Sequence, residues 1–354
     1  MKALVLSGGK GTRLRPITHT SAKQLVPIAN KPILFYALEA MRAAGITDIG
    51  IIVGDTRAEI EEAVGNGAAW DAKVTYIPQE APLGLAHAVK IAQPFMQDEP
   101  FVMFLGDNLI REGITRLVEE FQVSKANAHI LLAKVKNPQD FGVAELQGDR
   151  VVRLEEKPAR PKSDLALVGV YMFDHNVFEA VNVIKPSARG ELEITDAIQY
   201  LIDNDYSVRW QVISGWWKDT GKLEDMLEAN RLALDGLEPE MSGEVDETSQ
   251  IFGRVSIGAG TTIVNSVIRG PAIIGTGCTL QSSYVGPYSS IYNGVRICKS
   301  EIEHSIVLEN SVIEDIGSRI EDSLIGKNVL VTKDNKKPKA YRFMLGDHSE
   351  VSVT

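Results

Sequence analysis

Six cations gather in the first 38 residues of a chain that is acidic overall. No Asp or Glu accompanies them, although the 354 residues carry a formal net charge of −10; the six are Lys2, Lys10, Arg13, Arg15, Lys23 and Lys31. Within this stretch an apolar run, 3–6, leads into a glycine-rich turn, 7–12. Backbone N–H groups of such a turn and nearby cationic side chains converge on phosphate oxygens. The pattern therefore predicts a binding site for a nucleoside triphosphate.

The glycine turn departs from the two common phosphate-binding fingerprints. Gly8, Gly9 and Gly11 fit neither Gly-x-x-x-x-Gly-Lys-Ser/Thr nor Gly-x-Gly-x-x-Gly. A turn with only a structural role is the alternative interpretation. Arg13 and Lys23 would then repel one another with no carboxylate nearby, which favours an anionic ligand.

One carboxylate has the position that a metal ligand needs. Asp107 follows the apolar run 101–105, so we expect it at the C-terminal edge of a sheet, where doubly wound folds bind ligands. Mg²⁺ in such sites is held by one or two carboxylates together with phosphate oxygens. The sequence predicts Asp107 as a Mg²⁺ ligand, with a helix or turn cap as the alternative.

Composition narrows the class of protein. Apolar residues make up 44% and charged residues 24% of the chain, as in ordinary globular proteins. There is no apolar run long enough to span a membrane and no secretion signal at Met1, and Cys278 and Cys298 are too few for a disulfide framework. We therefore expect a cytoplasmic protein that does not bind a membrane. The acidic balance argues against nucleic acid as a partner.

Residues 1–237 alternate short apolar strands with amphipathic helices, which predicts an α/β domain with a doubly wound, mostly parallel, Rossmann-like sheet. The segment 141–157 instead predicts a hairpin that turns at Gly148 and Asp149. The expected strands are 3–6, 49–53, 74–77, 101–105, 130–135, 165–173 and 208–213. The expected helices are 33–44, 58–64, 85–95, 114–121, 191–202 and 223–234.

Beyond residue 237 the pattern changes. A polar segment, 238–250, is typical of a linker, and in 251–332 an aliphatic residue recurs about every sixth position. A helix would give a period of about 3.6 and an ordinary strand a period of about 2. A period near six predicts a left-handed parallel β-helix of hexapeptide repeats. The segment 333–354, which begins with the lysine-rich stretch 333–339, is expected to be a C-terminal tail.

Ordered motifs beyond the glycine turn point to a known family. They are Lys23-Gln24-Leu25, Gln79-x-x-Pro82-x-Gly84, Gly106-Asp107-Asn108, Phe141-Gly142-Val143, Glu155-Glu156-Lys157-Pro158, Gly190-Glu191-Leu192-Glu193-Ile194-Thr195-Asp196 and Trp217-Lys218-Asp219. On these motifs the chain resembles the sugar-1-phosphate nucleotidyltransferases. It is most similar to the thymidylyl-transferring branch, because guanylyl-transferring relatives usually have Pro-Lys-Pro and uridylyl-transferring ones Pro-Lys-Glu at the Lys23 motif. The additional β-helix resembles the long form of that branch, found among others in antibiotic-sugar pathways.

The resemblance implies a reaction and a set of catalytic groups. The substrates would be dTTP and α-D-glucose 1-phosphate, and the products dTDP-glucose and pyrophosphate, with Mg²⁺ as the cofactor. Arg13 and Lys23 would neutralise the triphosphate, and Lys157 would bind the sugar phosphate. Asp107 and Asp219 would hold the metal.

The resemblance also implies which residues line the two substrates. The nucleotide would contact Leu6, Gly8, Gly9, Gly11, Thr12, Arg13, Lys23, Gln24, Gln79, Gly84 and Asp107. The sugar phosphate would contact Asn108, Gly142, Glu156, Lys157, Leu167, Tyr171, Arg189 and Trp217, with Leu167 in place of the family's usual valine. The Gln79 amide suits the edge that thymine and uracil share, and one methyl group discriminates by only about 1–3 kcal/mol, so UTP stays open as the substrate.

Two further interpretations concern the whole protein. The β-helix could carry a second, acyl-transferring activity based on His304, but the tyrosine expected three positions on is replaced by Val307. An inactive scaffold subunit is disfavoured because the catalytic cations and carboxylates are intact. Instead we expect the β-helix to assemble the protein, since flat-sided prisms pack around a threefold axis. A homotrimer is the first expectation, and a tetramer through the catalytic domain is the alternative.

Overall fold

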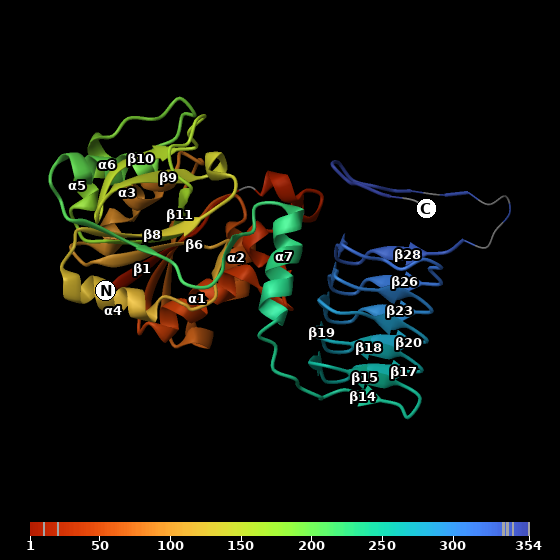
Figure 1. The fold of residues 1–354 in the computed structure, drawn as a ribbon. Helices are drawn as coiled ribbons and strands as arrows, with labels where there is room; N and C mark the ends of the chain where they lie inside the picture. Colours follow the sequence, from red (N-terminus) through yellow and green to blue (C-terminus); the bar gives the residue numbers. More distant parts are fainter. Residues whose placement is uncertain (10, 20, 335–336, 338–339, 342, 353–354) are drawn as a thin grey trace. The chain divides into compact units, whose positions relative to one another are not determined.

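The computed structural model describes residues 1–9, 11–19, 21–334, 337, 340–341 and 343–352 (Figure 1). The chain divides into two compact units. The first comprises Met1–Lys10, Ser21–Leu25 and Ile33–Asp219, and the second comprises Gly11–Thr20, Val26–Pro32 and Thr220–Thr354. Among the described residues, no helix is long and apolar enough to cross a membrane.

A nine-stranded sheet forms the centre of the first unit. Its parallel part has the order β6-β1-β4-β5, and β8 and β12 form a further parallel pair. The strands are β1 (Lys2–Ser7), β4 (Asp48–Val53), β5 (Lys73–Pro78), β6 (Phe101–Leu105), β8 (Ala128–Lys134), β9 (Gly142–Gln147), β10 (Arg150–Glu156), β11 (Leu165–Phe173) and β12 (Val208–Val212).

Strand β11 runs antiparallel to β6, β8 and β9, in the middle of the sheet. The predicted hairpin explains this reversal, since β9 and β10 pair antiparallel just before β11 in the chain. The Rossmann-like parallel core is confirmed, with this reversed strand inserted beside β6.

Helices cover both faces of the sheet, which confirms the doubly wound arrangement. Successive residues of β1 show why, because Leu4 and Leu6 join one buried cluster while Ala3 and Val5 join the other. The first cluster contains residues of α3 (Leu85–Met96), α5 (Val177–Val183) and α6 (Ile194–Asp203). The second contains residues of α1 (Ile33–Ala43), α2 (Arg57–Val64) and α4 (Thr115–Ser124).

Two short strands lie beside this sheet and position the site. Strand β13 (Trp217–Asp219) pairs antiparallel with β7 (Asn108–Ile110), which places Asp219 opposite Asn108. The 3-10 turn η3 (Lys23–Leu25) belongs to the same unit. In this way segments distant in sequence meet just beyond the end of β6.

The second unit contains the predicted β-helix, whose strands form three parallel sheets. The first has β14 (Glu244–Val245), β17 (Thr262–Val264), β20 (Thr279–Gln281), β23 (Arg296–Cys298), β26 (Val312–Glu314) and β28 (Leu330–Thr332). The second has β15 (Gln250–Phe252), β18 (Val267–Arg269), β21 (Tyr284–Val285) and β24 (Glu301–Ile302). The third has β16 (Val255–Ile257), β19 (Ala272–Ile274), β22 (Ser289–Ile291), β25 (Ile306–Val307) and β27 (Leu324–Ile325).

Stacked aliphatic side chains fill the β-helix. Ile257, Ile274, Ile291 and Val307 follow one another in register through the third sheet and are buried. This stack confirms the hexapeptide prediction, because the aliphatic residues that recur at about every sixth position point inward. Strand β14 and the start of β15 fall within the segment that the sequence assigns to a linker.

Short segments from the start of the chain also belong to this second unit. They are the 3-10 turns η1 (Thr12–Leu14) and η2 (Ile17–His19) and the hairpin of β2 (Pro27–Ile28) and β3 (Lys31–Pro32). Helix α7 (Leu223–Leu234) follows Thr220 in the same unit.

Candidate active site

Two carboxylates and one ammonium group meet at the C-terminal edge of the sheet. The Nζ atom of Lys23 lies 2.5 Å from Oδ2 of Asp107 and 4.0 Å from Oδ1 of Asp219. Asp107 comes from the turn after β6, and Asp219 ends β13. The side chains are largely buried, with 12% of Lys23 and 21% of Asp107 exposed. The structure thus brings together three of the predicted catalytic residues.

The charge state of Asp107 follows from this arrangement. Burial raises the pKa of its carboxyl, but the Lys23 ammonium and a hydrogen bond from Asn108 lower it more, so the pKa lies below its ordinary value. Asp107 is therefore an anion at neutral pH.

A hydrogen-bonded relay orients Asp107. The Nδ2 atom of Asn108 donates to Oδ1 of Asp107 (2.9 Å), and Nε1 of Trp217 donates to Oδ1 of Asn108 (2.6 Å). The Trp217 ring packs edge-on against Phe141, with 5.3 Å between the ring centres. Trp217 therefore orders Asn108 as well as bordering the predicted sugar site.

Gly169 completes the relay, and the sequence interpretation missed it. A Cβ atom at this position of β11 would lie 2.6 Å from Oδ1 and 2.7 Å from Cγ of Asn108. Any side chain larger than that of glycine would overlap with the Asn108 amide. The sequence does contain a signal for this contact: Gly169 is a single glycine inside an apolar strand, and such a glycine often marks a position where another group lies close to the backbone.

The predicted base-reading residues also lie together. The Nε2 atom of Gln79 donates to the Gly84 carbonyl (3.3 Å) and lies 3.0 Å from Nδ1 of His87. Burial lowers the pKa of His87, and Lys90 lowers it further. A Cβ atom on Gly8 would lie 3.3 Å from Oε1 of Gln79, so the glycine turn and the Gln79 amide are neighbours. His87 was not predicted; it lies in the first turn of α3, three residues after Gly84.

Gly84 has a conformation that only glycine adopts easily. Its φ is +104°, and a Cβ atom would lie 2.3 Å from the Leu192 carbonyl oxygen. The backbone of Leu192 is bonded to this turn at both ends, to the Leu83 carbonyl and from the Ala86 N–H. This contact joins the base-reading turn to the segment that contains Glu193.

Two buried polar atoms beside the glycine turn have no hydrogen-bond partner among the described residues. They are Oγ of Ser7 and Oε1 of Gln24. Gln24 is only 3% exposed, and a Cβ atom on Gly9 would lie 3.8 Å from its amide nitrogen. Buried polar groups are normally satisfied, so these atoms indicate a place for a polar ligand. Ser7, like Gly169 and His87, is not among the site residues predicted from the sequence.

The predicted sugar-binding residues form a third group around Glu156. A Cβ atom on Gly142 would lie 3.0 Å from both Oε2 of Glu156 and Cδ1 of Leu167. Arg189 lies 3.4 Å from Oε1 of Glu156 and 3.5 Å from Oε1 of Glu193. Glu193 was quoted within a motif but was not expected to take part.

Burial controls the ionisation of this third group. It raises the pKa of Glu156, and Glu193 raises it further, against the opposing charges of Lys157 and Arg189. Burial and the nearby Glu156 also raise the pKa of the Tyr171 hydroxyl, which stays protonated. The group can therefore accept and donate hydrogen bonds to a polyhydroxylated ligand.

Lys157 is held at the end of β10 in a conformation that is rare for a residue with a side chain. Its φ is +45°, and its backbone N–H donates to the Phe141 carbonyl (2.9 Å). Such strain is concentrated at functional sites. Lys157 is thereby placed next to Glu156, and Phe141 links it to the Trp217 ring.

The remaining residues that are predicted to bind the nucleotide are divided between the two units. Leu6 is the penultimate residue of β1, and its carbonyl accepts from the Gly106 N–H (2.9 Å) in the first unit. Gly11, Thr12 and Arg13 belong to the second unit, where Gly11 has a φ of +60° and its carbonyl accepts from the Thr18 hydroxyl (2.6 Å). Thr18 is a further residue that stabilises the turn carrying Arg13.

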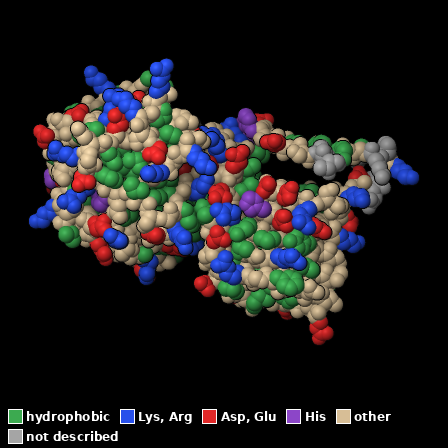
Figure 2. Space-filling model, in the orientation of Figure 1, with side chains coloured by type: hydrophobic (Ala, Val, Ile, Leu, Met, Phe, Trp, Pro, Cys, Tyr) green, Lys and Arg blue, Asp and Glu red, His purple; other side chains and the backbone are tan. Residues whose placement is uncertain are grey.

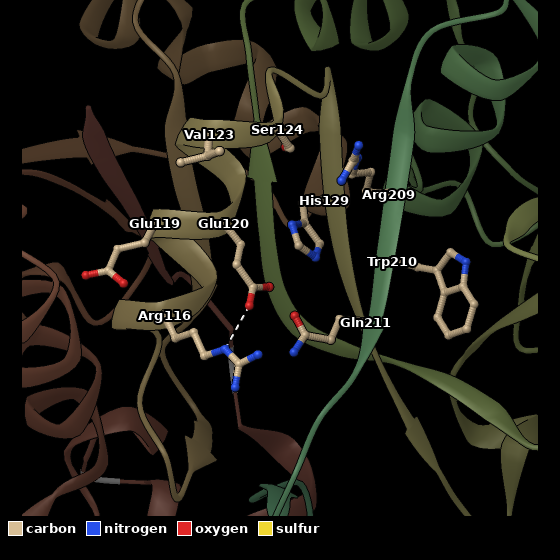
Figure 3. Close-up of a pocket in the computed structure, with 9 residues that line it drawn as sticks. All are labelled: Arg116, Glu119, Glu120, Val123, Ser124, His129, Arg209, Trp210 and Gln211. Atoms are coloured by element: carbon tan, nitrogen blue, oxygen red, sulfur yellow. Dashed lines mark hydrogen bonds and ion pairs between the residues drawn. The ribbon is translucent and has the colours of Figure 1, made fainter.

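A separate hollow of about 560 Å³ lies between α4 and the strands β8 and β12 (Figure 3). None of the predicted site residues lines it. Arg116 pairs with Glu120 across one turn of α4 (2.8 Å), and the buried His129 has no hydrogen-bond partner for either ring nitrogen among the described residues. The candidate active site is therefore the edge around Asp107 and not this hollow.

Comparison with known proteins agrees with this geometry. A family model described as nucleotidyl transferase matches residues 2–236. The glucose-1-phosphate thymidylyltransferase of Streptomyces antibioticus is 58% identical over 355 residues, spanning 100% of this chain and 99% of its own. That of Streptomyces griseus is 55% identical, spanning 100% of both chains.

A solved structure from Bacillus anthracis, described as a glucose-1-phosphate thymidylyltransferase in complex with sucrose, has a TM-score of 0.63. It is 38% identical and covers 66% of this chain and 95% of its own. The fold and the family model define the chain as a nucleotidyltransferase. It belongs to the glucose-1-phosphate thymidylyltransferase family, in the form with an additional C-terminal region. The alternatives, including an acyl-transferring β-helix, are not favoured.

The relay through Asn108 leads to a prediction for Gly169→Ala. The added methyl group must displace the Asn108 amide, which is 1% exposed and bonded to both Asp107 and Trp217. We expect kcat/KM to fall about tenfold or more, which corresponds to about 1.4 kcal/mol of transition-state stabilisation. Steady-state kinetics on the folded variant measure this. Gly317→Ala is the control, because a Cβ atom there meets nothing within 4 Å; equal activity of the two variants would contradict the relay.

Proposed function

We propose that this chain transfers a thymidylyl group from dTTP to α-D-glucose 1-phosphate, giving dTDP-glucose and pyrophosphate. The observation that carries the proposal is the Lys23 ammonium beside the carboxylates of Asp107 and Asp219 at the sheet edge. The full-length similarity to proteins named glucose-1-phosphate thymidylyltransferase supports the choice of both substrates.

The carboxylates of Asp107 and Asp219 are suited to bind Mg²⁺ as the cofactor. Asp107 and Asp219 both lie within 4.0 Å of one ammonium nitrogen, so they can share a cation. The described residues contain no cluster of three or more His, Cys, Asp or Glu side chains that could hold a metal by themselves. Two carboxylates plus phosphate oxygens are a usual set for Mg²⁺. When bound, the ion would neutralise charge on the triphosphate and on the departing pyrophosphate.

The chemistry needs no general base. A sugar 1-phosphate is mostly a dianion at neutral pH, because its second pKa is about 6. One of its oxygens attacks the α-phosphorus of dTTP in line, and the bond from that phosphorus to the pyrophosphate oxygen breaks, inverting the α-phosphorus. No covalent enzyme intermediate forms. The task of the protein is to bring two anions together, so catalysis depends on positioning and charge neutralisation.

Each cation has a distinct role in this proposal. Arg13 and Lys23 neutralise the triphosphate, and Lys157 holds the sugar phosphate. Gln79 reads the thymine edge. At the nucleotide, the Gln24 amide oxygen accepts a hydrogen bond and the Ser7 hydroxyl donates or accepts one, since neither oxygen has a partner among the described residues. The rest of the nucleotide pocket is formed by Leu6, Gly8, Gly9, Gly11, Thr12 and Gly84. The sugar is lined by Asn108, Gly142, Glu156, Leu167, Tyr171, Arg189 and Trp217.

We further propose a cytoplasmic homo-oligomer that supplies an activated sugar for nucleotide- and deoxysugar synthesis. Hydrophobic side chains gather on the visible face of the β-helix (Figure 2). Exposed apolar residues of its strands include Phe252 in β15, Val264 in β17 and Leu330 in β28. Contiguous apolar surface of this kind marks an interaction site. A trimer through the β-helix is favoured, and a tetramer through the catalytic domain is the alternative.

A substrate matrix tests the reaction. Pyrophosphate release is measured with dTTP, UTP, GTP and ATP against glucose 1-phosphate and other sugar 1-phosphates, with Mg²⁺. We expect the highest kcat/KM for dTTP with glucose 1-phosphate. UTP lacks the 5-methyl group and carries a 2′-hydroxyl, and the methyl group alone should favour dTTP by about 10- to 200-fold. Robust turnover of GTP or ATP with negligible use of dTTP would show that the assignment is wrong.

Lys157→Ala separates the two substrates. Removal of the ammonium that binds the sugar phosphate should raise KM for glucose 1-phosphate about 100-fold and leave KM for dTTP within about twofold. The matched control is Lys162→Ala, because the Lys162 side chain is 63% exposed and forms a surface ion pair with Glu145 (3.5 Å). Unchanged sugar-phosphate kinetics in Lys157→Ala would remove Lys157 from the site.

A further inference from the structure

The N-terminal signature is divided between the two compact units. Of residues 11–32, only Ser21–Leu25, which contains Lys23, belongs to the first unit. The segments on either side, Gly11–Thr20 and Val26–Pro32, belong to the unit of the β-helix. The chain therefore enters and leaves the Lys23 turn from segments packed with the C-terminal region.

The hairpin after Lys23 is bonded to α7 and to the β-helix by a buried asparagine. Oδ1 of Asn230 accepts from the Ala29 N–H (2.9 Å) and from the Ser290 hydroxyl (2.6 Å). Its Nδ2 donates to the Tyr288 carbonyl (3.0 Å). Asn230 is 1% exposed, so water does not compete for these bonds. The Asn230 side chain, which comes from α7, thus connects the β2–β3 hairpin to β22 and to the residue before it.

A second bond repeats the connection. The Nδ2 atom of Asn30 donates to the Ile291 carbonyl in β22 (2.7 Å). Ala29 and Asn30 have φ values of 47° and 58°, a turn that suits Asn and Gly but is unfavourable for Ala. The bond from Ala29 to Asn230 therefore stabilises a conformation that Ala29 would not hold by itself.

The segment before Lys23 rests on the last coil of the β-helix. A Cβ atom on Gly326, which follows β27, would lie 3.3 Å from Cδ1 of Ile17 in η2. Thr18 of the same turn donates to the Gly11 carbonyl (2.6 Å), which ties η2 to the residues just before Arg13. The packing of Ile17 on Gly326 is thus transmitted to the Arg13 turn.

From these contacts we propose that the β-helix unit positions the two segments that flank Lys23, and that Asn230 is a positioning residue for nucleotidyl transfer. The inference rests on the proposed role of Arg13 and Lys23 at the triphosphate. It assigns the β-helix a role in the reaction beyond the assembly role that the hexapeptide pattern suggests. Removal of residues 239–354 would eliminate the Ser290 and Tyr288 partners of Asn230 together with the contacts of Asn30 and Ile17, so the truncated chain would lose affinity for the nucleotide.

Asn230→Ala tests the proposal in the full chain. We expect KM for dTTP to rise about tenfold or more, because small displacements of positioning groups have large effects, and KM for glucose 1-phosphate to change less than about twofold. Amide hydrogen exchange of 26–32 should become faster in the absence of any substrate. The matched control is Asn127→Ala, which removes two side-chain hydrogen bonds, one to Asp174 and one from the Ser207 N–H, in the first unit. Both variants should lower Tm, but only Asn230→Ala should change KM for dTTP.

A second pair of variants keeps the test independent of Asn230. Gly326→Val pushes on Ile17, whereas Gly317→Val adds the same side chain where nothing lies within 4 Å of a Cβ atom. We expect faster exchange in 11–19 and a higher KM for dTTP only in Gly326→Val. If Asn230→Ala and Gly326→Val match their controls in either exchange or KM for dTTP, the proposal is wrong. A failure of the proposed function would give a different result. The wild type would then not use dTTP, although the differences in amide hydrogen exchange between each variant and its control would persist.

Discussion

The structure depends on one electrostatic constraint, the placement of a buried ammonium between two carboxylates. Asp107 and Asp219 would repel one another at the same sheet edge without the Lys23 cation. Neighbouring groups fix each partner: Asn108 and Trp217 orient Asp107, the β7–β13 pairing places Asp219, and η3 carries Lys23. The Lys23 ammonium therefore offsets part of the negative charge of the resting site and keeps Asp107 ionised for a cation.

The surrounding fold brings polar groups to this edge at little cost to the core. Strands β1 and β6 end side by side, where the Gly106 N–H bonds the Leu6 carbonyl, and their apolar residues fill both faces of the sheet. Glycines at the close approaches, such as Gly84 and Gly169, allow backbone and amide groups to come near one another. The second unit holds the flanking segments through Asn230, so the rigid hexapeptide stack supports residues far from it in sequence.

Local sequence patterns predicted the elements and the charged groups. The apolar run before Asp107 and the six-residue period after residue 250 depend only on nearby residues. The strand and the β-helix that they predict are both present in the structure. Other features depend on tertiary contacts. Gly169 matters only because Asn108 packs on it, and Asn230 looks like any polar residue of a helix until Ala29 and Ser290 surround it. The reversed direction of β11 likewise follows from the position of the β9–β10 hairpin within the sheet.

Metal binding to the nucleotide-free protein tests the central claim most directly. Since the Lys23 ammonium occupies the carboxylate pair, Lys23→Gln should bind Mn²⁺ about tenfold or more tightly than the wild type in an electron paramagnetic resonance titration. Asp107→Asn and Asp219→Asn should bind it more weakly, and Lys162→Gln should match the wild type. If Lys23→Gln binds Mn²⁺ no more tightly than the wild type, Lys23 does not neutralise a metal-binding pair of carboxylates, and the account is contradicted.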